Sequence, residues 1–70
     1  MTAKEMFEKL GWRVYEEKNG VCCEPNSKGY DGIFFDECHQ IITMFGFDCE
    51  ISKELLKSII QMAKELGWLE

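Results

Sequence analysis

The side chains with the most chemical potential in this sequence are four cysteines and one histidine. Thiolates and imidazole nitrogens are preferred ligands of Zn²⁺. Zinc sites usually pair their ligands two to four residues apart, and the sequence has neither a Cys-x-x-Cys nor a second histidine. Adjacent cysteines in a strand point to opposite faces, so they do not reach one ion. The spacing therefore predicts structural thiols, with a structural zinc or redox thiol site as an alternative. The candidates are Cys22, Cys23, Cys38, His39 and Cys49.

Cys38 and His39 are neighbours in the sequence and suggest a nucleophile with its base. Catalytic pairs of this kind normally come from distant parts of the chain, with a third group that orients the imidazole. Adjacent residues in a tight turn rarely face each other, and a turn offers no pocket that excludes water. We therefore predict no catalytic residue, no cofactor and no metal, and a chain that is not an enzyme.

Length and composition narrow the class of protein. The 70 residues predict a single domain over residues 1–70. Leu, Ile, Val and Phe number 18, which is too many for a disordered chain. The net charge of −5 argues against direct binding of nucleic acid, and no apolar run approaches the length of a membrane helix. The cysteine content is below that of disulfide scaffolds and no leader is recognisable, so we predict a cytoplasmic location with free thiols.

Two segments have the apolar spacing of helices, residues 2–10 and 52–66. Each begins at a residue that can cap a helix, Thr2 or Ser52. Each ends at a glycine that is followed by tryptophan, which is typical of a left-handed helix end. The second helix carries a wide apolar stripe, which consists of Leu55, Leu56, Ile59, Ile60, Met62, Ala63 and Leu66.

The intervening residues have the pattern of four strands. Asn19-Gly20 is a strong signal for a two-residue hairpin turn, and it predicts that Lys18 pairs with Val21. A second hairpin is predicted from 32–36 and 40–45. The element order predicts an α+β fold, α-β-β-β-β-α, in which an antiparallel four-stranded meander carries two helices on one face.

The second hairpin is apolar on both of its faces. A three-residue turn over 37–39 pairs Asp36 with Gln40 and places Phe34, Ile42 and Met44 on the face away from the helices. The chain has no third helix to cover that face. We predict that it contacts a second copy or another protein, with Tyr15 at its margin. The alternatives are that residues 25–30 and 46–50 cover this face, or that the register differs.

Acidic residues gather in the second half of the sequence. Residues 36–50 contain Asp36, Glu37, Asp48 and Glu50 and no Lys or Arg. Such a run is usually a solvated edge. The functional alternative is an acidic inhibitor or regulator that occupies the basic groove of a nucleic-acid enzyme.

Several segments carry a resemblance to known proteins. They are Leu10-Gly11-Trp12, Phe35-Asp36, and the final run from Ile51 through Glu65-Leu66-Gly67-Trp68-Leu69. With these the chain resembles a group of small uncharacterised proteins from phages, prophages and mobile elements of Gram-positive bacteria. The resemblance implies a cytoplasmic location and a phage- or host-facing setting. It implies no chemistry and assigns no site residue.

The sequence thus favours a small acidic protein that acts by contact rather than by catalysis. The predicted function is a protein-interaction module whose partner is itself or another protein, without direct contact to nucleic acid or membrane. The predicted contact residues are Tyr15, Phe34, Ile42 and Met44.

Overall fold

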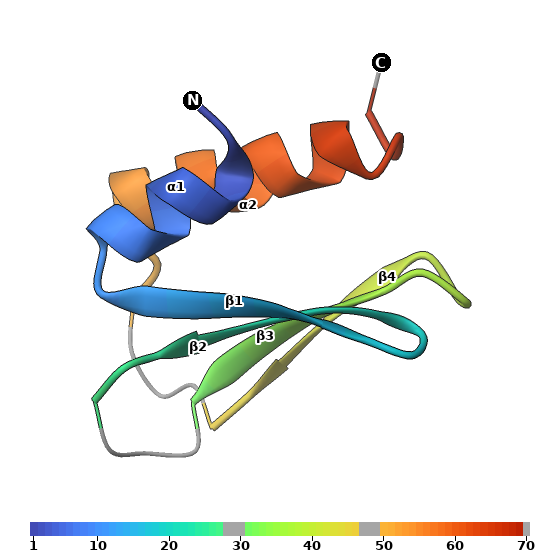
Figure 1. Ribbon diagram of the computed structural model, residues 1–70, viewed down its shortest axis with the longest axis horizontal. Coiled ribbons are helices and arrows are strands. Elements are labelled where there is room, and N and C mark those ends of the chain that lie inside the picture. Colours follow the sequence, from blue (N-terminus) through green and yellow to red (C-terminus); the bar gives the residue numbers. More distant parts are fainter. Residues whose placement is uncertain (28–30, 47–49, 70) are drawn as a thin grey trace.

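A helix, a four-stranded antiparallel meander and a second helix follow one another along the chain, as predicted. The computed structural model describes residues 1–27, 31–46 and 50–69. Both helices lie on the same side of the sheet (Figure 1), which we call the helix face, and the opposite side is the back face. The sheet order is β1-β2-β3-β4. The elements are α1 (Ala3–Lys9), β1 (Trp12–Glu17), β2 (Gly20–Pro25), β3 (Gly32–Asp36), β4 (Ile41–Phe45) and α2 (Lys53–Glu65).

Both helices begin at the predicted capping residues. The Thr2 hydroxyl accepts the N–H of Glu5 at 3.2 Å, and the Glu5 carboxylate accepts the N–H of Thr2 at 2.8 Å. The Ser52 hydroxyl accepts the N–H of Leu55 at 3.0 Å. These bonds satisfy N–H groups that have no partner within the first turn of a helix.

Each helix ends at a glycine in the left-handed region, with φ of +82° at Gly11 and +80° at Gly67. After α2 the chain folds back, so that the N–H of Trp68 donates to the Ala63 carbonyl at 2.9 Å. The two helices are also joined directly, because the Glu65 carboxylate accepts the N–H of Ala3 at 2.7 Å. This bond fixes the start of α1 against the end of α2.

The core lies between the helices and the two central strands. Phe7, Cys23, Ile33 and Phe35 are fully buried, and one side of α2 completes the cluster. Two aromatic pairs extend it. The ring centroids of Phe7 and Trp12 lie 5.7 Å apart, and those of Phe35 and Trp68 lie 6.1 Å apart, which are ordinary distances for tilted aromatic pairs.

The predicted register of the first hairpin is wrong. Glu17 pairs with Gly20, so the turn is Lys18-Asn19 and Lys18 does not pair with Val21. A Cβ at Gly20 would lie 2.0 Å from the carbonyl oxygen of Phe35. This glycine therefore serves the close approach of β2 and β3 rather than the turn. The slip is even, so the predicted faces of both strands are preserved.

The predicted register of the second hairpin is also wrong, and here the slip is odd. Asp36 pairs with Ile41, not with Gln40, because the turn has four residues, 37–40. Asp36 holds this turn, since its carboxylate accepts the backbone N–H of His39 at 3.1 Å and lies 2.9 Å from the His39 Nδ1. Gln40 closes the turn in the left-handed region with φ of +55°.

An odd slip reverses the two faces of a strand. Ile42 pairs with Phe35 and Met44 pairs with Ile33, so both lie on the helix face rather than on the back face. Phe34 lies on the back face as predicted, where it pairs with Thr43. The neighbours of Thr43 on that face are Ile41 and Phe45.

Two serines of α2 test the role of the cap. We expect Ser52→Ala to lower the free energy of unfolding by about 1 kcal/mol, because the N–H of Leu55 loses its partner. Ser58→Ala is the control, although Ser58 is buried. Its hydroxyl only donates to the Glu54 carbonyl, so its removal leaves no backbone N–H of the helix without an acceptor. Urea denaturation measures both, and a larger loss for Ser58→Ala would contradict the assignment.

Candidate interaction surface

β4 is exposed along its whole length, although its sequence is that of a buried strand. All five residues are exposed, and none is charged. In the part of the chain that the structure describes, no strand pairs with the outer edge of β4. Four large apolar side chains of this strand are 37–52% exposed, and they divide equally between the two faces of the sheet. They are Ile41, Ile42, Met44 and Phe45.

The hydrogen bonds beyond the strand ends show which backbone groups of β4 point outward. Residues of an antiparallel strand bond alternately to one neighbouring strand and to the other. The N–H of Asn26 donates to the Gly11 carbonyl at 2.8 Å, so the even-numbered residues of β2 bond to β1 and its odd-numbered residues bond to β3. The N–H of Glu37 donates to the Asn19 carbonyl at 2.9 Å, so the odd-numbered residues of β3 bond to β2 and its even-numbered residues bond to β4. The backbone groups that point from β4 to β3 then belong to Ile41, Thr43 and Phe45.

Ile42 and Met44 therefore direct their N–H and C=O groups away from the sheet. An outward backbone group flanked by apolar side chains is a template for another strand. The two residues thus combine an outward hydrogen-bonding edge with side chains that lie on the helix face. Their exposure reflects the arrangement of the layers, because the core that the helices cover is centred on β2 and β3.

The opposite edge of the sheet is protected in a way that β4 is not. β1 contains Arg13, Glu16 and Glu17. The Arg13 guanidinium lies 2.8 Å from the Glu24 carboxylate of the next strand. Charged side chains along an edge oppose the addition of a further strand. Among the residues that the structure describes, the edge of β4 has no such charges and is therefore suited to strand addition.

A groove of about 510 Å³ runs between α2 and β4 on the helix face. Its wall from α2 includes Ile59, Ile60 and Ala63, and its wall from the sheet includes Ile42. Ile60 belongs to the outer part of the apolar stripe of α2, which the sheet does not cover. Leu56, one turn earlier, is 49% exposed in the same way. The groove extends the apolar surface of β4 onto the helix.

The back face has a different character. Tyr15, Cys22 and Phe34 lie side by side across three strands. A hydrogen bond with the Cys22 thiol, partial burial and the nearby Glu24 carboxylate together raise the pKa of Tyr15 above its ordinary value. Phe34 also borders a hollow of about 430 Å³ that reaches Phe45. Apolar and polar groups are mixed here.

The structure separates the four predicted contact residues. Tyr15 and Phe34 lie on the back face, whereas Ile42 and Met44 lie on the helix face. The alternative that residues 25–30 and 46–50 cover the back face falls on residues 28–30 and 47–49, which lie outside the described residues.

Sequence reasoning missed part of this surface. Ile41 and Phe45 complete the edge strand, and Ile60 completes the groove. The signal for Ile60 was present, since the apolar stripe of α2 is wider than one contact with a sheet requires.

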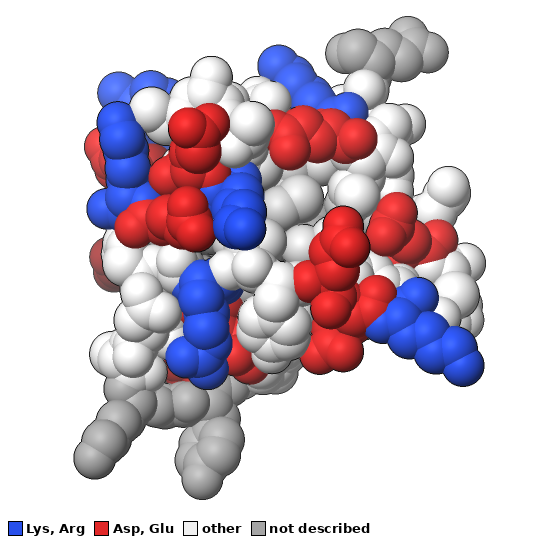
Figure 2. Space-filling model, viewed as in Figure 1, with Lys and Arg blue, Asp and Glu red and all other residues white. Residues whose placement is uncertain are grey.

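The predicted acidic residues do not act alike. Asp36 is engaged with His39, and its two hydrogen bonds from that residue lower the pKa of the Asp36 carboxyl. Glu37 and Glu50 are exposed. Asp48 lies outside the described residues. On the face shown in Figure 2, acidic side chains lie beside basic ones rather than in a patch of one sign.

The hollow on the back face also brings thiols near an imidazole. Its wall includes Cys22, Cys38 and His39. The His39 side chain is 75% exposed, so a nucleophile here would work in open water. Across residues 1–27, 31–46 and 50–69, no group of three or more His, Cys, Asp or Glu could hold a metal ion. Cys49 lies outside these residues.

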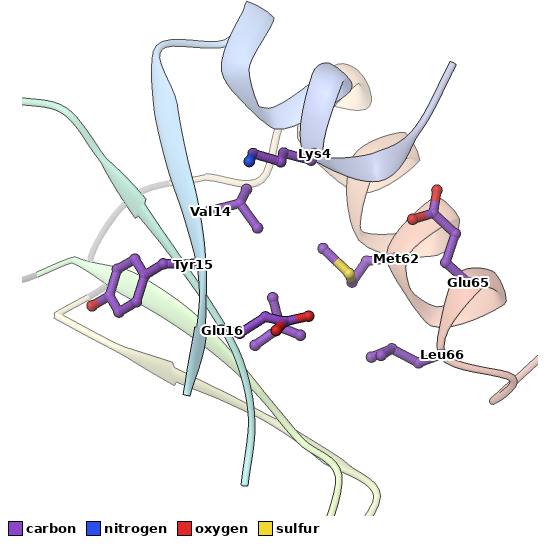
Figure 3. Close-up of a pocket in the computed structure, with 8 residues that line it drawn as sticks. Lys4, Val14, Tyr15, Glu16, Met62, Glu65 and Leu66 are labelled. Carbon is purple, nitrogen blue, oxygen red and sulfur yellow. The ribbon is translucent and has the colours of Figure 1, made fainter. Parts of the chain in front are cut away.

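A further groove, of about 610 Å³, separates β1 from the helices (Figure 3). Val14 and Glu16 point into it from β1, whereas Tyr15 projects from the other side of the strand. Glu65 faces it from α2, but its carboxylate already accepts the N–H of Ala3 and the side-chain N–H of Gln61. The lining contains neither a thiol nor an imidazole, so this groove offers no nucleophile of either kind.

Comparisons of this chain with protein-family models, with curated proteins and with solved structures found no match. The resemblance to phage and prophage proteins therefore stays a prediction. Within the described part of the chain, neither helix is long and apolar enough to cross a bilayer.

The turn that sets the register of β4 should respond to acid. The hydrogen bonds from His39 lower the pKa of the Asp36 carboxyl in the folded chain. The ionised carboxylate therefore stabilises the fold fully above the pKa of the unfolded chain, about 3.9, and this stabilisation is lost as the pH falls through the lower pKa of the folded chain. We expect Asp36→Asn to flatten the decline of stability below about pH 4 in urea denaturation. Glu37→Gln is the control and should follow the unchanged protein. An equally steep decline in Asp36→Asn would contradict the assignment.

The thiols should differ in reactivity. Cys38 is exposed, whereas Cys22 and Cys23 are buried, and burial raises the pKa of Cys23 to about 12. Because the thiolate is the reacting form, we expect iodoacetamide at about pH 8 to modify Cys38 first in the native chain. Mass mapping of a Cys49→Ser variant would measure this, with urea-unfolded protein as the control. Equal rates at Cys38 and Cys23 in the native chain would contradict the prediction.

Proposed function

We propose that this domain is a protein-interaction module that binds another polypeptide by adding a strand to β4. The observation that carries the proposal is an exposed, uncharged edge strand with apolar side chains on both faces. Natural sheets usually protect such an edge with charges, proline, a bulge or a covering loop. β1 has that protection, and β4 lacks the charges and the proline.

Strand addition explains why both faces of β4 are apolar. Main-chain hydrogen bonds at Ile42 and Met44 would supply affinity, and side chains at alternate positions would supply specificity. On the helix face, the added strand would place a side chain over the groove beside Ile60. On the back face, it would cover Ile41 and Phe45. Burial of this surface favours association by about 25 cal/mol per Å².

The module acts by binding and not by catalysis in this proposal. The predicted docking face therefore moves from the centre of the back face to the edge of the sheet. Ile42 and Met44 remain contact residues, now through the helix face. Phe34 and Tyr15 become neighbours of the contact rather than its centre.

A library of displayed peptides with randomised extended segments tests the proposal. We expect selection against the immobilised domain to enrich peptides with apolar residues at alternate positions. Ile42→Lys should abolish their binding, because lysine at an edge opposes strand addition.

The matched control is Glu16→Lys, since Glu16 and Ile42 lie on the same row of side chains across the sheet and at opposite edges. This variant should bind the selected peptides as the unchanged domain does. Failure to enrich any peptide, or equal binding by Ile42→Lys, would refute strand addition at β4.

A further inference from the structure

Resting on this proposed function, we infer that the partner strand is β4 of a second copy, paired antiparallel about Thr43. The two four-stranded sheets then join into one continuous sheet around a twofold axis. Three features of the described residues support this occupant: the outward backbone groups, the side chains of β4, and the area that is available.

The outward backbone groups favour one register, in which both outward residues of each copy face an outward residue of β4 in the other copy. An antiparallel pair forms two hydrogen bonds where an outward residue of one strand faces an outward residue of the other. In β4 the outward residues are Ile42 and Met44. Pairing about Thr43 places Ile42 of each copy opposite Met44 of the other, so the outward N–H groups of these residues all find a carbonyl. A slip by one residue would leave them unmatched.

The same register matches the side chains. On the helix face, Ile42 meets Met44 twice. On the back face, Ile41 meets Phe45 twice, and the two Thr43 side chains meet on the axis. Cross-strand pairs of apolar and β-branched residues stabilise a sheet, whereas like charges directly opposite destabilise it. The strand contains no charge, so it is complementary to itself.

The available area suits a reversible dimer. A standard interface takes about 800 Å² from each partner, which would be about a sixth of the 4956 Å² exposed here. A contact made by one strand of five residues and the adjoining groove belongs to the smaller class of interfaces, which bury less than about 1,200 Å² in total. We expect dissociation constants of about 1–100 µM. A second copy is also the one partner present wherever this chain is present.

The salt dependence of association distinguishes a second copy from a basic partner. Each copy carries a net charge of −5, and Glu37 lies in the turn that precedes β4. Two copies therefore repel, so raising NaCl from about 50 to about 500 mM should tighten the dimer several-fold. A partner strand flanked by Lys and Arg would show the opposite dependence on salt.

Analytical ultracentrifugation of the full chain tests the dimer, and two variants with opposite charges at positions 42 and 44 test its register. We expect the unchanged protein to dimerise, and Ile42→Lys and Met44→Glu each to weaken the dimer at least tenfold. An equimolar mixture of the two variants should recover a heterodimer. The introduced lysine and the introduced glutamate can pair only where position 42 of one copy faces position 44 of the other. Glu16→Lys is the control and should still dimerise.

Amide exchange in the unchanged protein gives a readout that needs no variant. We expect the N–H groups of Ile42 and Met44 to be protected at concentrations above the dissociation constant and to lose protection on dilution. The N–H of Thr43 bonds within the sheet and is the internal control.

A chain that stays monomeric at about 1 mM, where an interface of this strength would be formed, or a dimer that Ile42→Lys leaves intact, would overturn the inference. A dimer whose variants fail to form a heterodimer would overturn the register about Thr43. A monomer whose β4 still binds selected peptides would refute self-pairing and leave strand addition standing. A monomer that binds none would refute both.

Discussion

The carboxylate of Asp36 stabilises the turn on which the geometry of the outer half of the sheet depends. By accepting the backbone N–H of His39 and pairing with its imidazole, it closes a turn of four residues instead of three. The length of that turn decides which side of the sheet each side chain of β4 faces. With three residues in the turn, Ile42 and Met44 would lie on the back face, and the groove beside α2 would lose Ile42 from its wall.

A second constraint is the small amount of helix available. The helices span 7 and 13 residues, and they cover a core centred on the two middle strands. β4 receives little of that cover, so its apolar residues face solvent on one side of the sheet as well as on the other. The outer part of the α2 stripe is left bare for the same reason. The groove thus results from a mismatch between the width of the sheet and the width of the helical layer.

Local chemistry allowed much of the fold to be predicted from the sequence. The caps at Thr2 and Ser52 act within a few residues, as do the glycines that end the helices, so their effects can be read without knowledge of the tertiary structure. The turns could not be read in this way. Gly20 is required by the Phe35 carbonyl of a strand distant in sequence, and Gln40 adopts a left-handed conformation that usually selects glycine or asparagine.

The two register errors had unequal effects on the prediction of the site. The slip in the first hairpin was even and left Tyr15 on its predicted face. The slip in the second was odd, so Ile42 and Met44 lie on the helix face instead of the predicted back face. The prediction that an apolar surface is left uncovered did not depend on that slip. That expectation depended on composition, which a change of register does not alter.

The unequal edges of the sheet also limit how far it can extend. A sheet that is receptive at both ends can add chains without end and form a fibre. Here the row of charges on β1 closes one end, so any joining at β4 leaves two closed ends outermost. Growth stops after a single step, and the product is a discrete particle instead of an open polymer. Loss of the charges on β1 would therefore turn a self-limiting assembly into an aggregating one.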